Sequence, residues 1–274
     1  MGKDYFRWAL TEWQEKVNKM SDTLIKELNQ GVLLLKLNRP EKKNAFNSEL
    51  WGALSDALME AREDDDVNVV VLTGAGKEFS SGQDLTSPGT PGGADYKTCE
   101  DAMAVFDKPL IGVAKGVAVG GGATTLFFTD ILYVGSSLRM RIPFTSLGLA
   151  PEFASSYMLQ AKIGTQRAAE LMFTSEWIDA DKAVESGIAR QKFDDDILLD
   201  KALEKAAEIA KWPAIALQET KRCMMEMHKK GIENALAVER DAMTRRMGSP
   251  ENIEAIMAFM QKREPDFNKL KNKG

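Results

Sequence analysis

The sequence contains little cysteine and almost no histidine. Of its 274 residues, two are cysteines, Cys99 and Cys223, and one is a histidine, His228. Two separated cysteines exclude a disulfide-rich scaffold and a cysteine zinc site, and they favour a reducing compartment. A single histidine excludes a histidine metal cluster, and the basic helical stretch KRCMMEMHKK around it is typical of a helix surface rather than of a catalytic triad. Acid–base chemistry is therefore expected from carboxylates, lysine, tyrosine or the backbone.

The sequence also lacks a basic excess and a long apolar run. Its 36 basic and 41 acidic residues give a net charge of −5, and the isoelectric point is near 5.2, so no electrostatic footprint for nucleic acid is present. No window approaches the 18 or so apolar residues of a membrane span. With 44% hydrophobic and 28% charged residues, the composition is that of a folded globular chain of one large domain or two small ones.

The two ends of the sequence show no clear targeting signal. Residues 1–20 carry apolar side chains at helical spacing without the apolar core of a secretory signal, so we expect a helical extension over residues 1–24. The final residues, NKLKNKG, contain no lipidation motif and no Ser-Lys-Leu ending.

Strand and helix patterns alternate over the first half of the chain. Short apolar runs predict strands, and the run Asn68–Thr73 is uniformly apolar enough to be buried on both faces. Asn47 and Ser48 open an amphipathic helix that continues to about Glu63. This alternation predicts an α/β core with right-handed crossovers. After residue 155 the pattern becomes helical, with predicted helices at 155–162, 165–173, 180–186, 196–211, 214–229 and from 231 onward.

Two glycine-containing segments each follow a predicted strand. In Phe79–Leu85, FSSGQDL, Gly82 allows a sharp turn that exposes the N–H of Gln83. The triplet Gly120–Gly122 opens an apolar helix, but it has neither the P-loop lysine nor the dinucleotide-binding spacing. Either segment alone is explained by a turn or by tight packing. Together they predict two N–H donors that converge on one oxygen, which is an oxyanion hole.

Glu152 is the candidate general base. It follows Pro151 and lies between the apolar pairs Leu149–Ala150 and Phe153–Ala154. Apolar surroundings raise the pKa of a carboxyl, as a general base requires. The alternative is a glutamate placed at a helix N-terminus, where the helix dipole favours it. The sequence leaves both open.

These segments, in this order, resemble the crotonase (enoyl-CoA hydratase/isomerase) superfamily. The resemblance covers roughly residues 25–265 and rests on the motifs at 37–45, 70–74, 79–85, 108–122 and 143–152. Within the superfamily, PFTSLGLAPEFASSY at 143–157 is similar to the peroxisomal-type 3,2-enoyl-CoA isomerases. The resemblance implies an α/β fold with a crotonase (ClpP-like) ββα spiral core over 25–205. A C-terminal helical trimerisation region is implied over 206–274.

The resemblance also implies roles for individual residues. It implies that the backbone N–H groups of Gln83 and Gly121 are the oxyanion donors and that Glu152 is the base. The implied acyl-CoA-binding residues are Ser80, Ser81, Gly82, Gln83, Asp84, Leu85, Gly120, Gly121, Thr124 and Phe144. Family hydratases carry glutamates where this chain has Thr124 and Phe144, so hydration is disfavoured and proton transfer by one base is favoured.

The implied activity is the shift of a 3-enoyl-CoA double bond to the 2-trans position in the oxidation of unsaturated fatty acids. The alternatives are other crotonase chemistry, such as dienoyl-CoA isomerisation or thioester hydrolysis, and a non-catalytic acyl-CoA-binding scaffold. No metal, nicotinamide or flavin is expected, because coenzyme A is part of the substrate. The resemblance further implies a homotrimer or a dimer of trimers, located in peroxisomes or mitochondria.

Overall fold

The computed structural model describes residues 17–21, 23–86 and 94–271. Its main sheet has seven strands in the order β1-β2-β3-β4-β5-β7-β10. Strands β3, β4, β5, β7 and β10 are parallel, whereas β1 and β2 are antiparallel at one edge. Their bounds are Val17–Ser21 (β1), Leu24–Asn29 (β2), Val32–Leu37 (β3), Val69–Gly74 (β4), Leu110–Ala114 (β5), Ile131–Gly135 (β7) and Gln191–Phe193 (β10).

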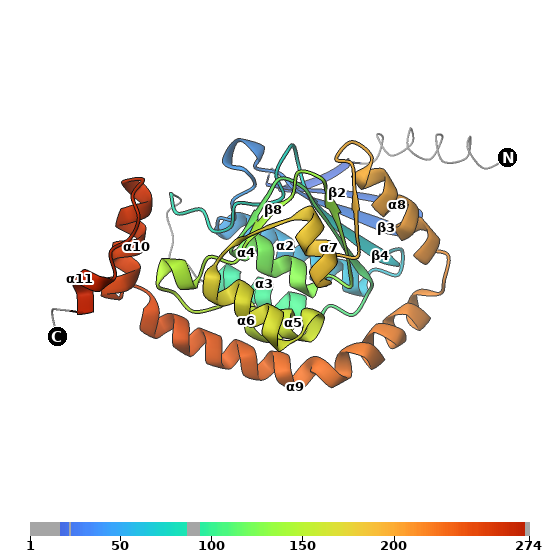
Figure 1. Ribbon diagram of the computed structural model, residues 1–274. Coiled ribbons are helices and arrows are strands. Elements are labelled where there is room, and N and C mark those ends of the chain that lie inside the picture. The colour runs from blue at the N-terminus through green and yellow to red at the C-terminus, as the bar shows by residue number, and fades with distance from the viewer. Residues whose placement is uncertain (1–16, 22, 87–93, 272–274) are drawn as a thin grey trace.

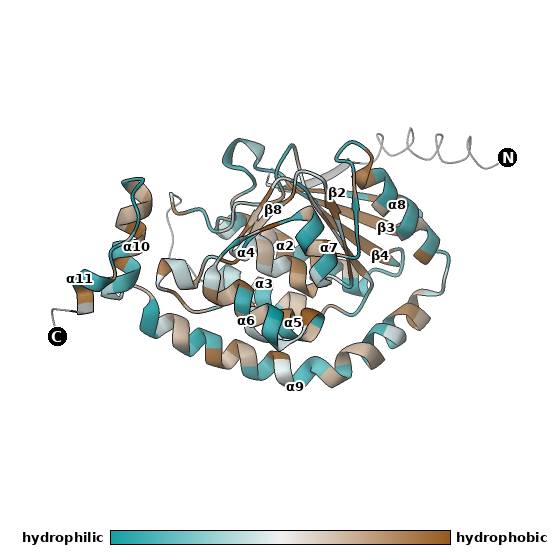
Figure 2. Cartoon of the chain, viewed as in Figure 1, coloured by the Kyte–Doolittle hydropathy of each residue, from teal (hydrophilic) through white to brown (hydrophobic). Residues whose placement is uncertain are grey.

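Helices cover both faces of this sheet, and the central parallel strands β4, β5 and β7 are apolar on both faces (Figures 1 and 2). On one face, Val69 and Val71 of β4 pack with Leu198 of α8. On the other, Val70 and Leu72 join the larger core beneath α2 and α3. The prediction that this strand is buried on both sides is confirmed, and so is the α/β class. The helices are α2 (Ser48–Glu63), α3 (Ala94–Val105), α4 (Gly121–Thr124), α5 (Ser155–Ile163), α6 (Thr165–Thr174), α7 (Ala180–Ser186) and α8 (Leu198–Ile209).

A second, three-stranded sheet lies beside the first and carries the glycine triplet. Its strands are β6 (Val117–Val119), β8 (Arg139–Arg141) and β9 (Trp177–Asp179), in the order β6-β8-β9. Gly120 follows β6 directly and donates its N–H to the carbonyl of Arg141 at 3.1 Å. The short helix α4 and the 3₁₀ turn Thr125–Phe128 continue from there into the core. This sheet therefore fixes where the triplet points.

The C-terminal part of the chain is helical. Helix α9 (Ala214–Arg246) curves beneath α5 and α6 and leads to α10 (Pro250–Met260) and α11 (Asn268–Lys271) (Figure 1). The two predicted helices at 214–229 and from 231 onward are one helix of 33 residues. Gly231 does not interrupt it, because this glycine serves packing: a Cβ there would lie 2.3 Å from the Tyr157 ring. In the described ranges, no helix combines the length and apolar character needed to cross a membrane.

The predicted boundaries need two corrections. The helical extension predicted over residues 1–24 is wrong at its end, because Val17–Ser21 form β1 on the edge of β2; residues 1–16 lie outside the described residues. Residues 17–21 pair with the edge of β2 through backbone hydrogen bonds, and this pairing stabilises a strand there despite the helical spacing of the apolar residues. The predicted division at residue 206 falls inside α8, and Ala202 and Ala206 of that helix belong to the core on the sheet.

Candidate active site

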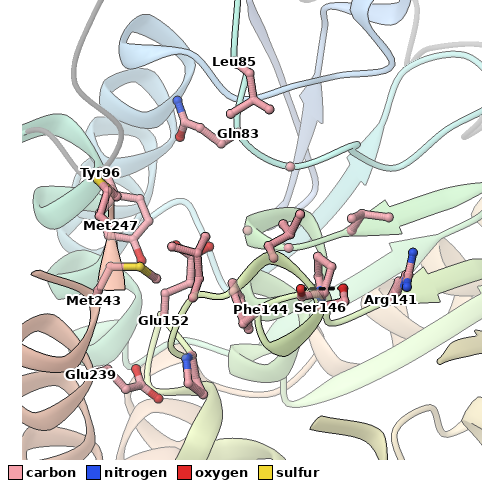
Figure 3. A pocket seen from close by; sticks show the side chains of 18 of the residues that line it. Gln83, Leu85, Tyr96, Arg141, Phe144, Ser146, Glu152, Glu239, Met243 and Met247 are labelled. Carbon is pink, nitrogen blue, oxygen red and sulfur yellow. Dashed lines mark hydrogen bonds between the residues drawn. The ribbon is translucent and has the colours of Figure 1, made fainter. Parts of the chain in front are cut away.

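A cavity of about 580 Å³ lies between the glycine-containing loops and the C-terminal helices. The loops contribute Ser81, Gly82, Gln83, Gly120 and Gly121 to its wall. Helix α3 contributes two polar side chains, Tyr96 and Glu100, and α9 contributes a mixed set of polar and apolar ones. Figure 3 shows Gln83 and Glu152 at one end of the cavity and Arg141 at the other. The rest of the wall is mainly apolar and includes Leu85, Val119, Phe144, Leu147, Leu149, Trp177, Met243, Met247 and Phe259.

The loop after β4 is held in place by its own side chains and by a neighbouring segment. The Ser80 hydroxyl donates to the carbonyl of Asn44 at 2.8 Å and accepts the N–H of Gly82 at 3.2 Å. Gly82 has φ +86° and a Cβ there would lie 2.5 Å from the Val119 carbonyl oxygen, so only glycine fits. The same Cβ position is 3.6 Å from the backbone nitrogen of Gly121. The two loops therefore run side by side.

The backbone geometry leaves two N–H groups pointing into this space. The carbonyl of Gly82 and the N–H of Asp84 both bond to Phe46, so the N–H of Gln83 faces the opposite way. Gly121 is the first residue of α4, where an N–H has no partner within the helix. Among the described residues, neither the Gln83 nor the Gly121 N–H donates to an acceptor. Two N–H groups without acceptors on adjacent loops are what the predicted oxyanion hole requires.

The Trp51 side chain lies behind both donors. Its ring stacks on Phe46 with centroids 3.8 Å apart. Its indole nitrogen donates to the Gln83 side-chain oxygen at 3.1 Å. A Cβ on Gly121 would lie 3.1 Å from the indole ring, so this glycine is needed for close approach. The sequence placed Trp51 only within an amphipathic helix, and no motif signalled this role.

Glu152 faces the same space from the loop before α5. The next two residues, Phe153 and Ala154, have φ values of +60° and +49°, so the chain turns sharply there. The Glu152 Oε1 atom lies 3.4 Å from the position of a Cβ on Gly121. The carboxyl group is thus beside Gly121, whose N–H is one of the two candidate oxyanion donors.

Burial raises the pKa of Glu152 to about 8. The neighbouring Glu100 and Glu239 carboxylates also raise the pKa of Glu152, while a hydrogen bond from Tyr96 lowers it. The alternative reading of Glu152 as a helix N-terminal residue is wrong, because Glu239 takes that place: its Oε1 accepts the N–H of Ser156 in α5 at 2.7 Å. A proton therefore binds Glu152 more tightly than an ordinary glutamate, as the general-base interpretation requires.

Two further carboxylates of the site were missed by sequence reasoning. Glu100 on α3 accepts the N–H of Phe153 at 3.0 Å and the Nε of Arg240 at 2.8 Å. Burial raises the pKa of Glu239 to about 7. Helix α3 begins in a Gly- and Pro-rich stretch whose composition is typical of a loop, but Cys99, Ala102, Met103 and Phe106 have helical spacing and are buried. That spacing was the signal that could have revealed Tyr96 and Glu100.

Comparison with known proteins places this geometry in a family. The model of the family described as enoyl-CoA hydratase/isomerase matches residues 27–271. The chain belongs to the enoyl-CoA hydratase/isomerase family. The family's crotonase fold is supported by a solved enoyl-CoA hydratase/isomerase from Pseudoalteromonas atlantica T6c, which is 34% identical with a TM-score of 0.85 and matches 89% of this chain and 99% of its own.

Relatives within the enoyl-CoA hydratase/isomerase family have several activities. The chain is 32% identical to the 1,2-epoxyphenylacetyl-CoA isomerase of Escherichia coli K12, over 90% of this chain and 99% of that protein. It is also 32% identical to the 2,3-dehydroadipyl-CoA hydratase of the same organism, over 89% and 98%. Human enoyl-CoA delta isomerase 2 is 30% identical over 88% of this chain and 64% of its own length. Membership therefore establishes acyl-CoA hydratase/isomerase chemistry as a class.

The structure brings together most of the residues that the family resemblance singled out. Those in the cavity wall are Ser81, Gly82, Gln83, Leu85, Gly120, Gly121, Phe144 and Glu152. Ser80, Asp84 and Thr124 are not part of the wall. Ser80 is buried behind the loop, Asp84 forms an ion pair with Arg39 at 2.9 Å, and Thr124 is fully buried in α4. These three residues support the site from outside the cavity, because their polar side-chain atoms bond to the protein: Ser80 to Asn44, Asp84 to Arg39 and Thr124 to Gly121.

The two positions that distinguish hydratases in this family carry no acid–base group here. Thr124 directs its hydroxyl to the carbonyl of Gly121 at 3.4 Å. Phe144 presents an aromatic ring to the cavity. In the part of the chain that the structure describes, no group of three His, Cys, Asp or Glu side chains is arranged to hold a metal ion.

Proposed function

We propose that the protein is a 3,2-trans-enoyl-CoA isomerase that moves a β,γ double bond of an acyl-CoA to the α,β position. The observation that carries this proposal is the placement of Glu152 beside Gly121, whose N–H, like that of the adjacent Gln83, donates to no acceptor within the described residues. A donor pair of this kind stabilises negative charge on a thioester oxygen. A single carboxyl group with a raised pKa can remove and return one proton.

The reaction proceeds through a dienolate. The thioester oxygen accepts the two N–H groups, and the Glu152 carboxylate removes a proton from C2. The electron pair of that C–H bond forms a C1–C2 double bond, and the negative charge rests on the held oxygen. Glu152, now protonated, gives its proton to C4 as the double bond moves from C3–C4 to C2–C3. The carboxylate is regenerated, and no water is added or lost.

The residues around Glu152 favour isomerisation over hydration. Hydration needs acid–base groups that position and activate water, and the family's hydratases use glutamates at the positions of Thr124 and Phe144. Here one of these is fully buried in α4 and the other is an aromatic wall residue. The resemblance of residues 143–157 to 3,2-enoyl-CoA isomerases and the similarity to human enoyl-CoA delta isomerase 2 support the same choice.

A dienoyl-CoA isomerase is the second candidate, and Glu239 favours it. This side chain lines the same cavity, and within the described residues its buried Oε2 has no hydrogen-bond partner. A second carboxyl group suits a proton shift over a longer acyl segment than one residue can reach.

The remaining features of the proposed enzyme follow the family resemblance. The proposed mechanism needs no metal, nicotinamide or flavin, since coenzyme A enters with the substrate. We propose a homotrimer or a dimer of trimers, which is supported by an exposed apolar stripe on α10 formed by Ile253, Ile256, Met257 and Met260. The proposed location, peroxisome or mitochondrion, rests on the resemblance alone.

The proposal is tested by a panel of substrates offered to the purified protein. The panel contains a 3-enoyl-CoA, a 2-trans-enoyl-CoA in water, and a 3,5-dienoyl-CoA. Absorbance measures the new conjugation with the thioester for the first and third substrates, and the loss of the conjugated double bond for the second. We expect the 3-enoyl-CoA to be converted with the highest kcat/KM. Faster hydration or faster dienoyl conversion would replace the proposal with the corresponding alternative. Binding without turnover on any member would indicate a non-catalytic acyl-CoA-binding protein.

A further inference from the structure

We infer that Tyr96 is a positioning residue for Glu152: its hydroxyl holds the carboxyl group of the base, and Glu100 holds the loop from which that base projects. The effect on turnover rests on the proposed isomerase function, whereas the effect on Glu152 itself does not.

The Tyr96 ring has a fixed position. It lies on α3 and packs edge-on against Trp51, with centroids 5.3 Å apart, and against Phe153, with centroids 5.6 Å apart. Figure 3 shows the hydroxyl end of this ring directed toward Glu152. Trp51 supports Gln83 and Gly121, and Phe153 directly follows Glu152. A movement of Tyr96 would therefore disturb the N–H donors and the loop that carries Glu152 together.

The Tyr96 hydroxyl lies between two carboxylates. It donates a hydrogen bond to the Oε1 atom of Glu100 at 3.5 Å, one helical turn further along α3, and Figure 3 shows it directed toward the Glu152 carboxyl group on its other side. Burial, followed by the nearby carboxylates, raises the pKa of Tyr96 well above its usual value. The phenol therefore stays protonated and acts as a donor to a carboxylate.

Glu100 is already engaged on both of its oxygens. Oε1 accepts the N–H of Phe153, whose φ of +60° belongs to the sharp turn after Glu152. Oε2 accepts the Nε of Arg240 from α9. Glu100 thus connects α3 to α9 and to the loop at residues 152–154 that carries Glu152. Because Glu100 keeps these two donors, the long 3.5 Å bond from Tyr96 to Glu100 can be exchanged for one to Glu152 when Glu152 is ionised.

The charged and titratable groups facing Glu152 act in opposite directions. Glu100 from α3 and Glu239 from α9 raise its pKa, while the Tyr96 hydroxyl lowers it. Arg240 from α9 is bound to Glu100 and Asp101 and compensates the charge of Glu100. Removing the hydroxyl and removing the Glu100 charge should therefore shift the titration of Glu152 in opposite senses.

The experiment compares Tyr96→Phe and Glu100→Gln with the wild-type protein. Both changes keep the shape of the side chain, and the glutamine keeps an oxygen for the Phe153 N–H. Tyr157→Phe is the matched control, because the Tyr157 hydroxyl bonds to His228 at 3.0 Å rather than to Glu152. Glu152 is titrated in the free protein by infrared spectroscopy, and its carboxyl band is identified by its disappearance in Glu152→Gln. The pH profile of kcat/KM on a 3-enoyl-CoA is measured in parallel.

We expect Tyr96→Phe to move the Glu152 midpoint upward by roughly one pH unit, since a hydrogen bond to a charged group is lost. It should lower kcat/KM at pH 7 by about 3- to 10-fold. Glu100→Gln should move the midpoint downward, and Tyr157→Phe should change neither quantity. An unchanged midpoint in Tyr96→Phe, or the same small change as in Tyr157→Phe, would overturn the assignment. The infrared shift without any isomerase turnover would keep the assignment and refute only the proposed reaction.

Discussion

The indole nitrogen of Trp51 donates a hydrogen bond of 3.1 Å to the side-chain oxygen of Gln83. The backbone N–H of the same Gln83 is one of the two proposed oxyanion donors, and the Trp51 ring lies against Gly121, which carries the other. One buried side chain from α2 therefore supports both donors. The contact explains how two loops far apart in the sequence keep a common geometry.

Trp51→Phe tests this support. Phenylalanine keeps an aromatic ring in the fully packed site but loses the N–H, so Gln83 becomes free to rotate. We expect kcat/KM on a 3-enoyl-CoA to fall about 2- to 10-fold, the range of one ordinary hydrogen bond. Thermal unfolding of the same variant measures how much of the change comes from reduced packing. Unchanged kcat/KM with a lowered melting temperature would limit Trp51 to a structural role.

Gly121→Ala tests whether the second donor needs close approach. An added Cβ would lie 3.1 Å from the Trp51 ring and 3.4 Å from the Glu152 carboxyl, so the loop has to shift. We expect at least about a tenfold loss of kcat/KM, because displacing one oxyanion donor costs about 2.7–4 kcal/mol when the loss is complete.

Gly164→Ala is the control for the effect of adding a methyl group to a glycine. Gly164 has φ +81° and nothing within 4 Å of an added Cβ, and it lies outside the cavity wall. It should lower stability by about 1 kcal/mol through backbone strain without altering kcat/KM. If both alanine variants lose activity equally, the crowding argument fails.

The pH dependence of catalysis follows from the pKa of Glu152, which burial raises to about 8. Only the ionised carboxylate can remove the C2 proton. We therefore expect kcat/KM to rise with pH, to be half-maximal near pH 8 and to level off above it. A pH-rate profile between pH 5 and 10 measures this midpoint. A profile already flat from pH 5 would show that Glu152 titrates as an ordinary glutamate or is not the base.

The same shift predicts a pH-dependent stability difference between wild type and Glu152→Gln. In the unfolded chain the Glu152 carboxyl group ionises with the ordinary glutamate pKa of 4.5, whereas the folded protein raises this pKa to about 8. Between these values the folded state binds more protons, so the free energy of unfolding of the wild type falls as pH rises. Glutamine does not ionise, so the free energy of unfolding of Glu152→Gln does not fall with pH for this reason.

We therefore expect Glu152→Gln to gain stability relative to wild type between pH 5 and pH 8.5. Each unit of pKa shift corresponds to about 1.4 kcal/mol, which makes the trend measurable by urea unfolding. Glu100 and Glu239 are present in both proteins, so their contributions largely cancel. A stability difference that is constant across this pH range would contradict the raised pKa.

Much of the fold and part of the site could be predicted from local patterns. The uniformly apolar strands, the helix capped at Asn47 and the two glycine segments are set by residues close together in sequence, and the structure places them as expected. The apolar neighbours of Glu152 predict the raised pKa that its surroundings produce. These features share one property: their signal lies within a few residues.

The missing parts of the site depend on contacts between distant segments. Tyr96 and Glu100 were hidden because α3 starts in a stretch that reads as a loop, and their function arises only where Phe153 approaches. Glu239 lies in the C-terminal half of α9, far along the chain, and accepts the N–H of Ser156 in α5. Gly231 looked like a helix end, but the close packing of Tyr157 explains it. The local spacing of apolar residues cannot predict such tertiary contacts.

The most direct test of the account is the turnover of Glu152→Gln on a 3-enoyl-CoA, measured beside wild type. Glutamine preserves the shape of the side chain and leaves the Gln83 and Gly121 N–H groups in place, so acyl-CoA binding, followed by calorimetry, should persist. We expect kcat to fall by at least about 100-fold, which is the scale of a lost general acid–base group. Near-normal kcat in this variant would contradict the central claim that Glu152 carries the proton.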